Sequence, residues 1–186
     1  VAVLVPVIKA VVAVERDASG LVLRREDRVV RAPDVAPPAS ERGGLRAALA
    51  PELQRVRGLP NVDWAVPMHR SQTNVLLPDG SRRMLDVTGL DDATLIGAPK
   101  TMIQGTISDL RIKDGMILDQ VAAEERLAYT DENGKLRTIQ VGDVLEINDH
   151  RVVVVGIAKM KRTFTMMAMG FTTYSRSVQL MPAERR

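Results

Sequence analysis

The chain has no cysteine and very few aromatic residues. The absence of cysteine excludes a disulfide framework and a thiolate metal site, and it fits a domain that works in an oxidising compartment without crosslinks. Aromatic residues make up 3% of the sequence, too few to form a platform on which single-stranded nucleic acid could stack. The net charge is +3, but the basic residues are scattered among acidic neighbours. A basic nucleic-acid-binding β-domain is therefore only a distant alternative.

Long apolar runs are also missing. No stretch reaches the about 20 apolar residues that a membrane-spanning helix needs. The nearest candidate, residues 1–14, is interrupted by Pro6 and Lys9 and predicts a strand. The chain does not begin with methionine and lacks the basic start and small-residue cleavage site of a secretory signal, so we expect an excised or processed part of a longer protein. Its 186 residues, 45% of them hydrophobic, suffice for one globular domain or two small lobes.

Groups that could support catalysis or bind a metal are sparse. Neither His69 nor His150 has a second histidine or a carboxylate at ligand spacing on the same element. No G-x-S-x-G sequence marks a nucleophilic serine, and no glycine-rich loop followed by Lys-Ser or Lys-Thr marks a phosphate site. The sequence therefore predicts no enzyme, no cofactor and no metal site.

Acidic residues recur in two places without forming a convincing site. Asp109, Asp114 and Asp119 are spaced every five residues, a spacing that does not match a calcium-binding loop. We expect these three carboxylates to be solvated in loops and at strand ends. The pair Asp91 and Asp92 predicts a turn or a helix cap.

Methionines gather in the segment KMKRTFTMMAMG, residues 159–170. Thioethers can bind Cu(I), but the basic residues in this segment would repel a cation. Two other interpretations stay open: the methionines fill the core, or they form an exposed apolar loop that contacts another protein. In the second case Met166, Met167 and Met169 are the candidate contact residues.

Local patterns predict an α+β fold in which strands dominate the second half of the chain. Strands are expected at 1–14, 20–23, 62–68, 75–77, 83–87, 115–119, 136–140, 143–147 and 151–157. Helices are expected at 45–56, 121–129 and 175–180, and residues 31–44 are expected to be a loop or linker. Turns are expected at Glu15-Arg16-Asp17, at Asp79-Gly80, at Asn133-Gly134 with type I′ geometry, and at Asn148-Asp149-His150. The run Val152–Val155 is typical of a strand buried on both faces.

Three blocks of sequence carry a family resemblance. They are VTGLDDATLIGAP at 87–99, GTISDLRIKDGMILD at 105–119, and VGDVLEINDHRVVVVGIAK at 141–159 together with FTTYSRSVQLMPAERR at 171–186. A weaker match is LQRVRGLPNVDWAVP at 53–67. These blocks resemble the extracytoplasmic domain of ABC-transporter permeases of the FtsX, MacB and LolC type, most of all the DevC-like branch. The resemblance covers residues 45–186 and departs from the family at 165–170, where relatives have a polar segment containing proline.

The resemblance implies a two-lobed fold. A porter-like α/β lobe would comprise residues 1–104 and 163–186, and a smaller β-rich lobe, similar to the one called sabre, would comprise residues 105–162. It also implies a periplasmic location, as part of a bacterial inner-membrane protein whose intact form is a dimer. No residue of such a domain is catalytic.

The resemblance further implies a function in export. A cytoplasmic ABC ATPase subunit would hydrolyse ATP, and the permease would convert this into movement outside the membrane. The expected partners are a periplasmic adaptor (membrane-fusion) protein and a TolC-like outer-membrane channel. The alternative within the same architecture is an FtsX-like regulatory domain that relays ATPase motion to a cell-wall hydrolase.

Overall fold

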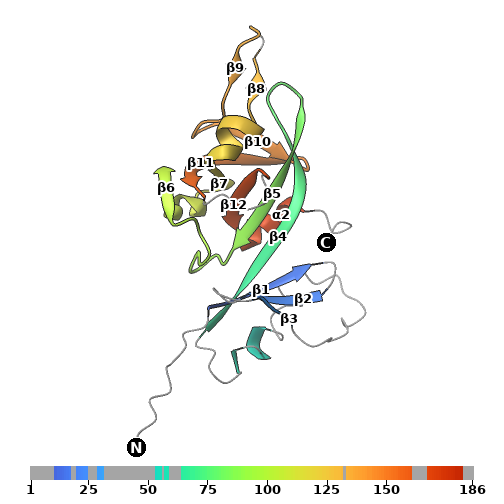
Figure 1. The fold of residues 1–186 in the computed structure, drawn as a ribbon, viewed down its shortest axis with the longest axis vertical. Helices are drawn as coiled ribbons and strands as arrows, with labels where there is room; N and C mark the ends of the chain where they lie inside the picture. The colour runs from blue at the N-terminus through green and yellow to red at the C-terminus, as the bar shows by residue number, and fades with distance from the viewer. Residues whose placement is uncertain are drawn as a thin grey trace, which may run out of the picture. The chain divides into compact units, whose positions relative to one another are not determined.

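A computed structural model describes residues 11–17, 20–24, 29–31, 53–55, 57–58, 64–131, 133–160 and 167–181 (Figure 1). The chain divides into two units, Val1–Met68 and His69–Arg186. No helix of the described residues has the length and apolar character needed to cross a membrane. The mixed strands and few helices confirm the α+β prediction.

The first unit is built on three strands and the beginning of a fourth: β1 (Val11–Asp17), β2 (Gly20–Arg24), β3 (Val29–Arg31) and β4 (Trp64–Leu76). β1 pairs with β2 in antiparallel fashion and with the start of β4 in parallel fashion, and β3 pairs with β2. The turn predicted at Glu15-Arg16-Asp17 is wrong, because these residues pair with β2. Charged side chains do not prevent the backbone from extending the ladder.

Several predictions for the first unit concern residues that the structure does not describe. These are residues 1–10 of the first predicted strand, 32–44 of the predicted linker and most of the predicted helix at 45–56. Residues 53–55 and 57 are helical. Arg57 donates hydrogen bonds from Nε and Nη2 to the carbonyl oxygen of Ala65, at 3.0 and 2.8 Å.

The second unit contains the rest of β4, β5 (Arg82–Leu90), β6 (Thr101–Gln104), the 3₁₀ helix η1 (Ile107–Arg111), β7 (Gly115–Asp119), the π-helical turn η2 (Ala122–Arg126), β8 (Tyr129–Thr130), β9 (Leu136–Arg137), β10 (Val144–Ile147), β11 (His150–Lys159), β12 (Met169–Thr173) and α2 (Tyr174–Leu180). The helix predicted at 121–129 is shorter than expected and ends with the π-helical turn at Ala122–Arg126. The predicted terminal helix is confirmed as α2. β9 covers only the first two residues of the strand predicted at 136–140.

Six of these strands form a closed ring in the order β4, β5, β12, β7, β11 and β10. β10 returns to β4 through two residue pairs, Val75 with Ile147 and Leu76 with Glu146. β5 and β12 are parallel, as are β7 and β11, and the remaining pairs are antiparallel. Closure removes the open edges at which sheets aggregate. β6 pairs with the end of β11, and β8 and β9 form a separate two-stranded ribbon.

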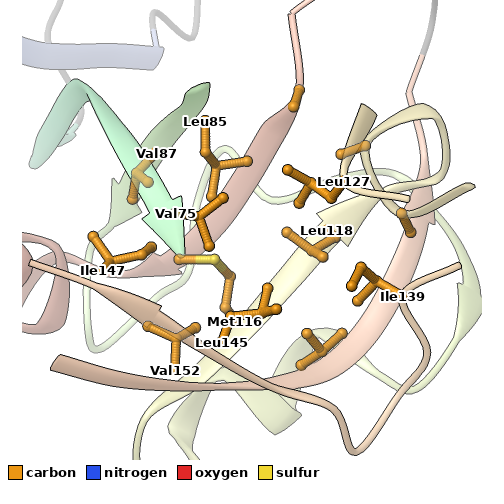
Figure 2. Close-up of a cluster of buried hydrophobic side chains, with 14 of the residues drawn as sticks. Val75, Leu85, Val87, Met116, Leu118, Leu127, Ile139, Leu145, Ile147 and Val152 are labelled. Atoms are coloured by element: carbon orange, nitrogen blue, oxygen red, sulfur yellow. The ribbon is translucent and has the colours of Figure 1, made fainter. Parts of the chain in front are cut away.

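Two hydrophobic clusters lie on opposite faces of the same strands. The first, shown in Figure 2, includes Val75, Leu85, Val87, Met116, Leu118, Leu145, Ile147, Val152 and Val154. The second includes Leu90, Leu95, Leu110, Ile117, Val155 and Phe171. Met116 and Ile117 are neighbours in β7 but belong to different clusters, as expected for alternating side chains. The run Val152–Val155 also divides between the clusters, which confirms a strand buried on both faces.

The strands of both predicted lobes meet in this barrel. β7 and β11 lie in the segment predicted as the smaller lobe, whereas β5 and β12 lie in the segments predicted as the larger one. The observed units also divide at Met68 rather than at residue 105. The assignment of residues 105–162 to a separate smaller lobe therefore stays a prediction.

The β10–β11 turn consists of two residues, Asn148 and Asp149. Their φ angles of 48° and 64° are both positive, which is type I′ geometry, and His150 already belongs to β11. The Asn148 side chain donates hydrogen bonds to Thr73 Oγ1 at 3.2 Å and to the Leu180 carbonyl oxygen at 2.7 Å. This turn therefore fixes the register of the hairpin and attaches it to β4 and α2.

We expect Asn148→Ala to lower the free energy of unfolding by about 2 kcal/mol, because it strains a left-handed backbone and removes both hydrogen bonds. Asn148→Gly should lower it by about 1 kcal/mol, because glycine relieves the strain but cannot restore the bonds. Urea denaturation of both variants measures the difference. Equal losses would show that the positive φ angle does not contribute.

The Asn133-Gly134 turn differs from its predicted type I′ geometry. Gly134 has a φ of 75°, and its N–H donates to the Asp131 carbonyl oxygen at 2.9 Å, so Gly134 closes the turn rather than lying at its centre. The Asp131 carboxylate accepts hydrogen bonds from the backbone N–H groups of Asn133 and Lys135 at 3.0 and 2.9 Å. These bonds favour a loop longer than two residues, which Gly134 closes in a left-handed conformation.

Candidate interaction surface

The outer face of the β4–β5 hairpin carries Met167, one of the two predicted contact methionines that the structure describes. Val75, Leu85 and Val87 point into the first cluster, so the alternate residues of the two strands face outward. We call the outward group of Arg70, Gln72, Asn74, Met84, Asp86 and the adjoining Met167 the hairpin face. Met84 is 57% exposed.

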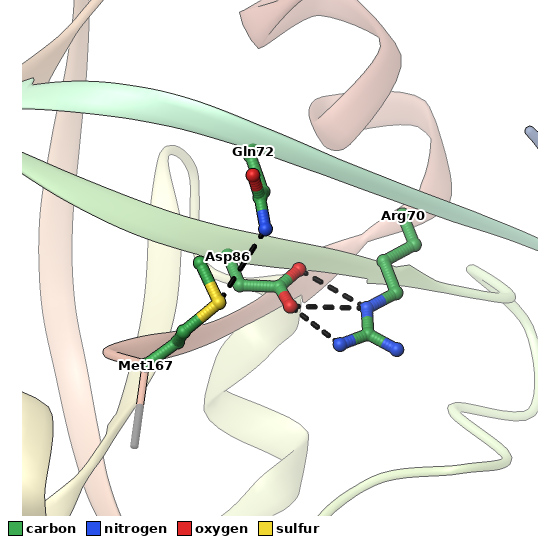
Figure 3. A network of polar contacts seen from close by, with 4 residues as sticks. All are labelled: Arg70, Gln72, Asp86 and Met167. Atoms are coloured by element: carbon green, nitrogen blue, oxygen red, sulfur yellow. Dashed lines mark hydrogen bonds and ion pairs between the residues drawn. The ribbon is translucent and has the colours of Figure 1, made fainter. Parts of the chain in front are cut away.

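A bidentate ion pair lies at the centre of the hairpin face (Figure 3). Arg70 donates from Nε to both Asp86 carboxylate oxygens at 3.1 Å and from Nη2 to Oδ2 at 2.5 Å. The Asp86 side chain is 3% exposed and that of Arg70 35% exposed. The buried carboxylate is therefore neutralised within the face, and its geometry is that of a structural pair.

The predicted contact methionines separate into different environments. The half-buried Met167 accepts a hydrogen bond from Gln72 Nε2 at Sδ over 3.4 Å, within the hairpin face. Met169 lies in β12 and packs against the second hydrophobic cluster. Met166 lies outside the described residues. Partner contact by these residues stays a prediction, and Met169 has a packing role in addition.

Sequence reasoning missed Met84, the most exposed methionine of the hairpin face. Its signal was nevertheless present in the alternation of Met84 and Asp86 with Leu85 and Val87. In a strand, that alternation places a methionine opposite the buried residues.

The predicted acidic residues have structural partners. Asp109 accepts a hydrogen bond from the Thr106 backbone N–H at 2.7 Å and closes a capping box at η1. Asp114 pairs with Arg176, and the two atoms are 2.8 Å apart. Asp119 is buried and accepts a hydrogen bond from the Met160 N–H, so the expectation that it is solvated is wrong. Its strand is covered on both faces, which a spacing of carboxylates could not indicate.

Four polar groups from different elements hold the short helix α2. Asp92 accepts hydrogen bonds from the Ser175 N–H at 3.0 Å and from its hydroxyl at 2.5 Å, whereas the neighbouring Asp91 lies in the predicted turn and accepts from the Thr94 N–H at 3.0 Å. Arg176 bonds to Asp114, Ser177 to His69, and the Leu180 carbonyl to Asn148. A helix of seven residues is unstable alone, so these contacts and its buried face stabilise it.

One of the two histidines, His69, packs in the interior of the second unit. His69 is buried, its Nδ1 lies 2.6 Å from Ser177 Oγ, and its ring meets that of Tyr174 edge-on with centroids 6.5 Å apart. His150 is exposed at the start of β11. Across the described ranges, no three His, Cys, Asp or Glu side chains are grouped as metal ligands.

Three of the exposed apolar residues lie on the segment that runs from β9 to β10. Leu136, Val141 and Val144 are 68%, 42% and 46% exposed. Beside Val144 lies a shallow depression of about 420 Å³, lined by Leu76, Leu77, Pro78, Val144, Leu145, Glu146, Asp149 and Arg151. We call this depression the barrel-end surface.

Two carboxylates, Asp79 in the β4–β5 turn and Asp131 in the loop of the ribbon, have lowered pKa values. Hydrogen bonds from the Ser81 hydroxyl and backbone lower the pKa of Asp79. The pKa of Asp131 is lowered by hydrogen bonds from the Lys135 backbone and the Arg137 side chain. Both carboxylates therefore stay ionised and joined to their donors at neutral pH.

Comparison with known proteins shows where such a domain occurs. The family described as the MacB-like periplasmic core domain matches residues 5–184. The chain is similar to the extracellular domain of the noncanonical ABC-type transporter YknZ from Gram-positive bacteria, with 14% identity, a TM-score of 0.47, and coverage of 68% of this chain and 63% of that one. It is also similar to the periplasmic region of MacB from Actinobacillus actinomycetemcomitans, with 15% identity, a TM-score of 0.35, and coverage of 59% and 47%. The chain thus spans less than two thirds of either solved chain. No curated protein matches it.

Proposed function

Because the chain belongs to the MacB-like periplasmic core domain family, we propose that it is the periplasmic domain of an ABC exporter permease of the DevC-like branch. In this role it couples ATP hydrolysis by a cytoplasmic ABC ATPase subunit to movement outside the inner membrane. It contacts a periplasmic adaptor protein, and a TolC-like channel completes the exporter. The intact permease is a dimer.

The observation that carries this proposal is the extent of the family match. Residues 5–184 include both units of the chain, so the match does not depend on one short motif. The DevC-like assignment and the exporter role rest on the sequence blocks at 87–99, 105–119 and 141–186. The division into a porter-like lobe and a β-rich lobe at 105–162 belongs to the same proposal.

The structure of the second unit suits a domain that transmits movement. The strand ring is closed and carries a packed cluster on each face of β7. Closely packed interiors have low compressibility, so a displacement of one strand moves the barrel as a body. The polar groups described here serve pairs, caps and turns rather than a reaction centre.

The full-length reading frame and a reconstituted system test the proposal. We expect apolar spans of about 20 residues on both sides of this segment. In proteoliposomes, the purified adaptor should bind the permease and raise ATP hydrolysis by its ATPase subunit. A reading frame without flanking spans, or an ATPase rate insensitive to the adaptor, would contradict it. A hydrolase that replaces the adaptor in this assay would favour the FtsX-like alternative.

The hairpin face provides a prediction about the adaptor contact. We expect Met84→Ser and Met167→Ser each to weaken adaptor binding about fivefold without changing the melting temperature, because both side chains adjoin solvent. Met169→Ser should lower the melting temperature, because Met169 packs on the second cluster. Titration calorimetry and thermal melting separate the two effects. Unchanged affinity in both surface variants would exclude the hairpin face as a contact.

A further inference from the structure

The loop of the β8–β9 ribbon contains Asn133-Gly134, the one Asn-Gly pair in the sequence. Both residues are exposed to solvent. The side-chain amide of an asparagine can be attacked by the backbone nitrogen of the next residue. Glycine favours this attack, because it has no Cβ atom to crowd the approach. Asn74 is followed by valine and Asn148 by aspartate, so in both cases the attacking nitrogen belongs to a bulkier residue.

The reaction at such a pair needs only the protein and water. The Gly134 nitrogen loses its proton and forms a bond to Cγ of Asn133, the Cγ–Nδ2 bond breaks, and ammonia leaves with that proton. The succinimide ring that results then adds water at one of its carbonyl carbons and opens. Opening at one carbon gives an aspartate at position 133. Opening at the other gives an isoaspartate, in which the main chain runs through the side-chain carbons.

In the folded loop, Asp131 engages the backbone around the reactive bond. The Gly134 N–H, which is the attacking group, donates to the Asp131 carbonyl oxygen at 2.9 Å. The Asp131 carboxylate accepts from the backbone N–H groups of Asn133 and Lys135 at 3.0 and 2.9 Å. Arg137 Nε donates to the second oxygen of that carboxylate at 3.0 Å. The attack therefore has to wait until these hydrogen bonds open.

The ribbon that carries this loop is short. Its strands are joined by two residue pairs, Tyr129 with Arg137 and Thr130 with Leu136. A two-stranded hairpin is marginally stable on its own, and exposed hydrogen bonds open in local fluctuations. The frequency of opening, and with it the rate of the reaction, therefore depends on the bonds that Asp131 makes.

We propose that Asn133 is a site of spontaneous deamidation and that the Asp131 carboxylate slows the reaction by holding the loop closed. Deamidation adds a second carboxylate to the loop, two residues from Asp131, and like charges at short range repel. The isoaspartate product also lengthens the main chain of the loop. Both changes disfavour the closed loop, so we expect the deamidated ribbon to open more often. This chemistry belongs to the chain itself and is independent of the proposed function.

Peptide mapping of the full chain tests the site. After incubation at neutral pH and physiological temperature, trypsin releases Asn133 in the peptide 127–135, Asn74 in 71–82 and Asn148 in 138–151. We expect the first peptide to convert into two products of slightly higher mass, whereas the other two peptides stay unchanged over the same time. Asn133→Gln should abolish the conversion, because the longer side chain closes a ring much more slowly. Conversion of peptide 127–135 no faster than that of the other two would overturn the site.

Variants of the ribbon test the role of Asp131. We expect Asp131→Ala to raise the rate of conversion in the folded chain about fivefold, and Arg137→Ala, which removes one bond to the carboxylate, about twofold. In urea the wild type and both variants should convert at one common rate, since the loop is open in all of them. Circular dichroism before digestion verifies that each variant is folded, and Arg137→Ala keeps the test decisive if Asp131→Ala is not. Equal rates in the folded state, or a difference that persists in urea, would overturn the protective role of Asp131.

Discussion

Replacing Gly89 with alanine is expected to lower the free energy of unfolding by about 3 kcal/mol, the upper end for an overpacked site. A Cβ atom at Gly89 would lie 2.4 Å from Ser177 Cβ and 3.2 Å from Tyr174 Cα. Neither atom is at the end of a flexible side chain, so α2 would have to move away from β5. That movement would also weaken the bonds from Asp92, His69 and Asn148.

A double-mutant cycle tests this steric explanation. Ser177→Gly removes the obstructing Cβ, at the expense of the hydrogen bond to His69. We expect the combination of Gly89→Ala and Ser177→Gly to be less destabilising than the sum of the single changes by at least 1 kcal/mol. Urea denaturation of the four proteins gives the coupling energy. Strictly additive losses would mean that the contact between β5 and α2 is looser than described.

The second large effect is expected at Leu118, which is fully buried in the first cluster between β11 and β12. Leu118→Ala should lower the free energy of unfolding by about 3 to 4 kcal/mol, through lost burial and the cavity that remains. A closed ring of strands limits the collapse that could fill this cavity.

The matched control for Leu118→Ala is Met84→Ala, which shortens an exposed side chain on a strand of the same barrel. We expect a change within about 0.5 kcal/mol for the control. Equilibrium unfolding in urea measures both variants. A loss below 1 kcal/mol for Leu118→Ala would contradict a rigid, well-packed barrel.

Local features of this fold could be predicted from the sequence. Asp79-Gly80 and Asn148-Asp149 both lie at hairpin turns, because the geometry of a tight turn depends on a few adjacent residues. The two wrong turn predictions, at Asn133-Gly134 and at Glu15–Asp17, also have local causes. In the first, the Asp131 side chain selects another loop, and in the second the backbone ladder continues through charged residues.

The barrel itself could not be predicted in this way. Its parallel pairs, β5 with β12 and β7 with β11, join segments far apart in the sequence, and no local pattern encodes their register. The same applies to the cap of α2, since Asp92 reaches Ser175 across the fold. Carboxylates that looked alike in the sequence, Asp114 and Asp119, differ because only one belongs to a doubly covered strand.

The candidate surfaces were predictable in part. The methionine-rich segment left core filling and a contact surface both open, and the structure places Met167 on the hairpin face. The separation of Met167 from Met169 depends on which side chain points toward the second cluster. The barrel-end surface had no sequence signal, because the residues that line its depression come together only when β4 meets β10.

The closure of the ring by Val75–Ile147 and Leu76–Glu146 has a consequence for biosynthesis. A ribosome makes β4 and β5 early and β10, β11 and β12 late, so the first hairpin must wait for its last neighbours. Until then, its apolar side is uncovered and its outer edges are unpaired, which is the condition in which strands associate with other chains. A chaperone that assists folding during synthesis would therefore act after β5 has been made and before β10, β11 and β12 have been made.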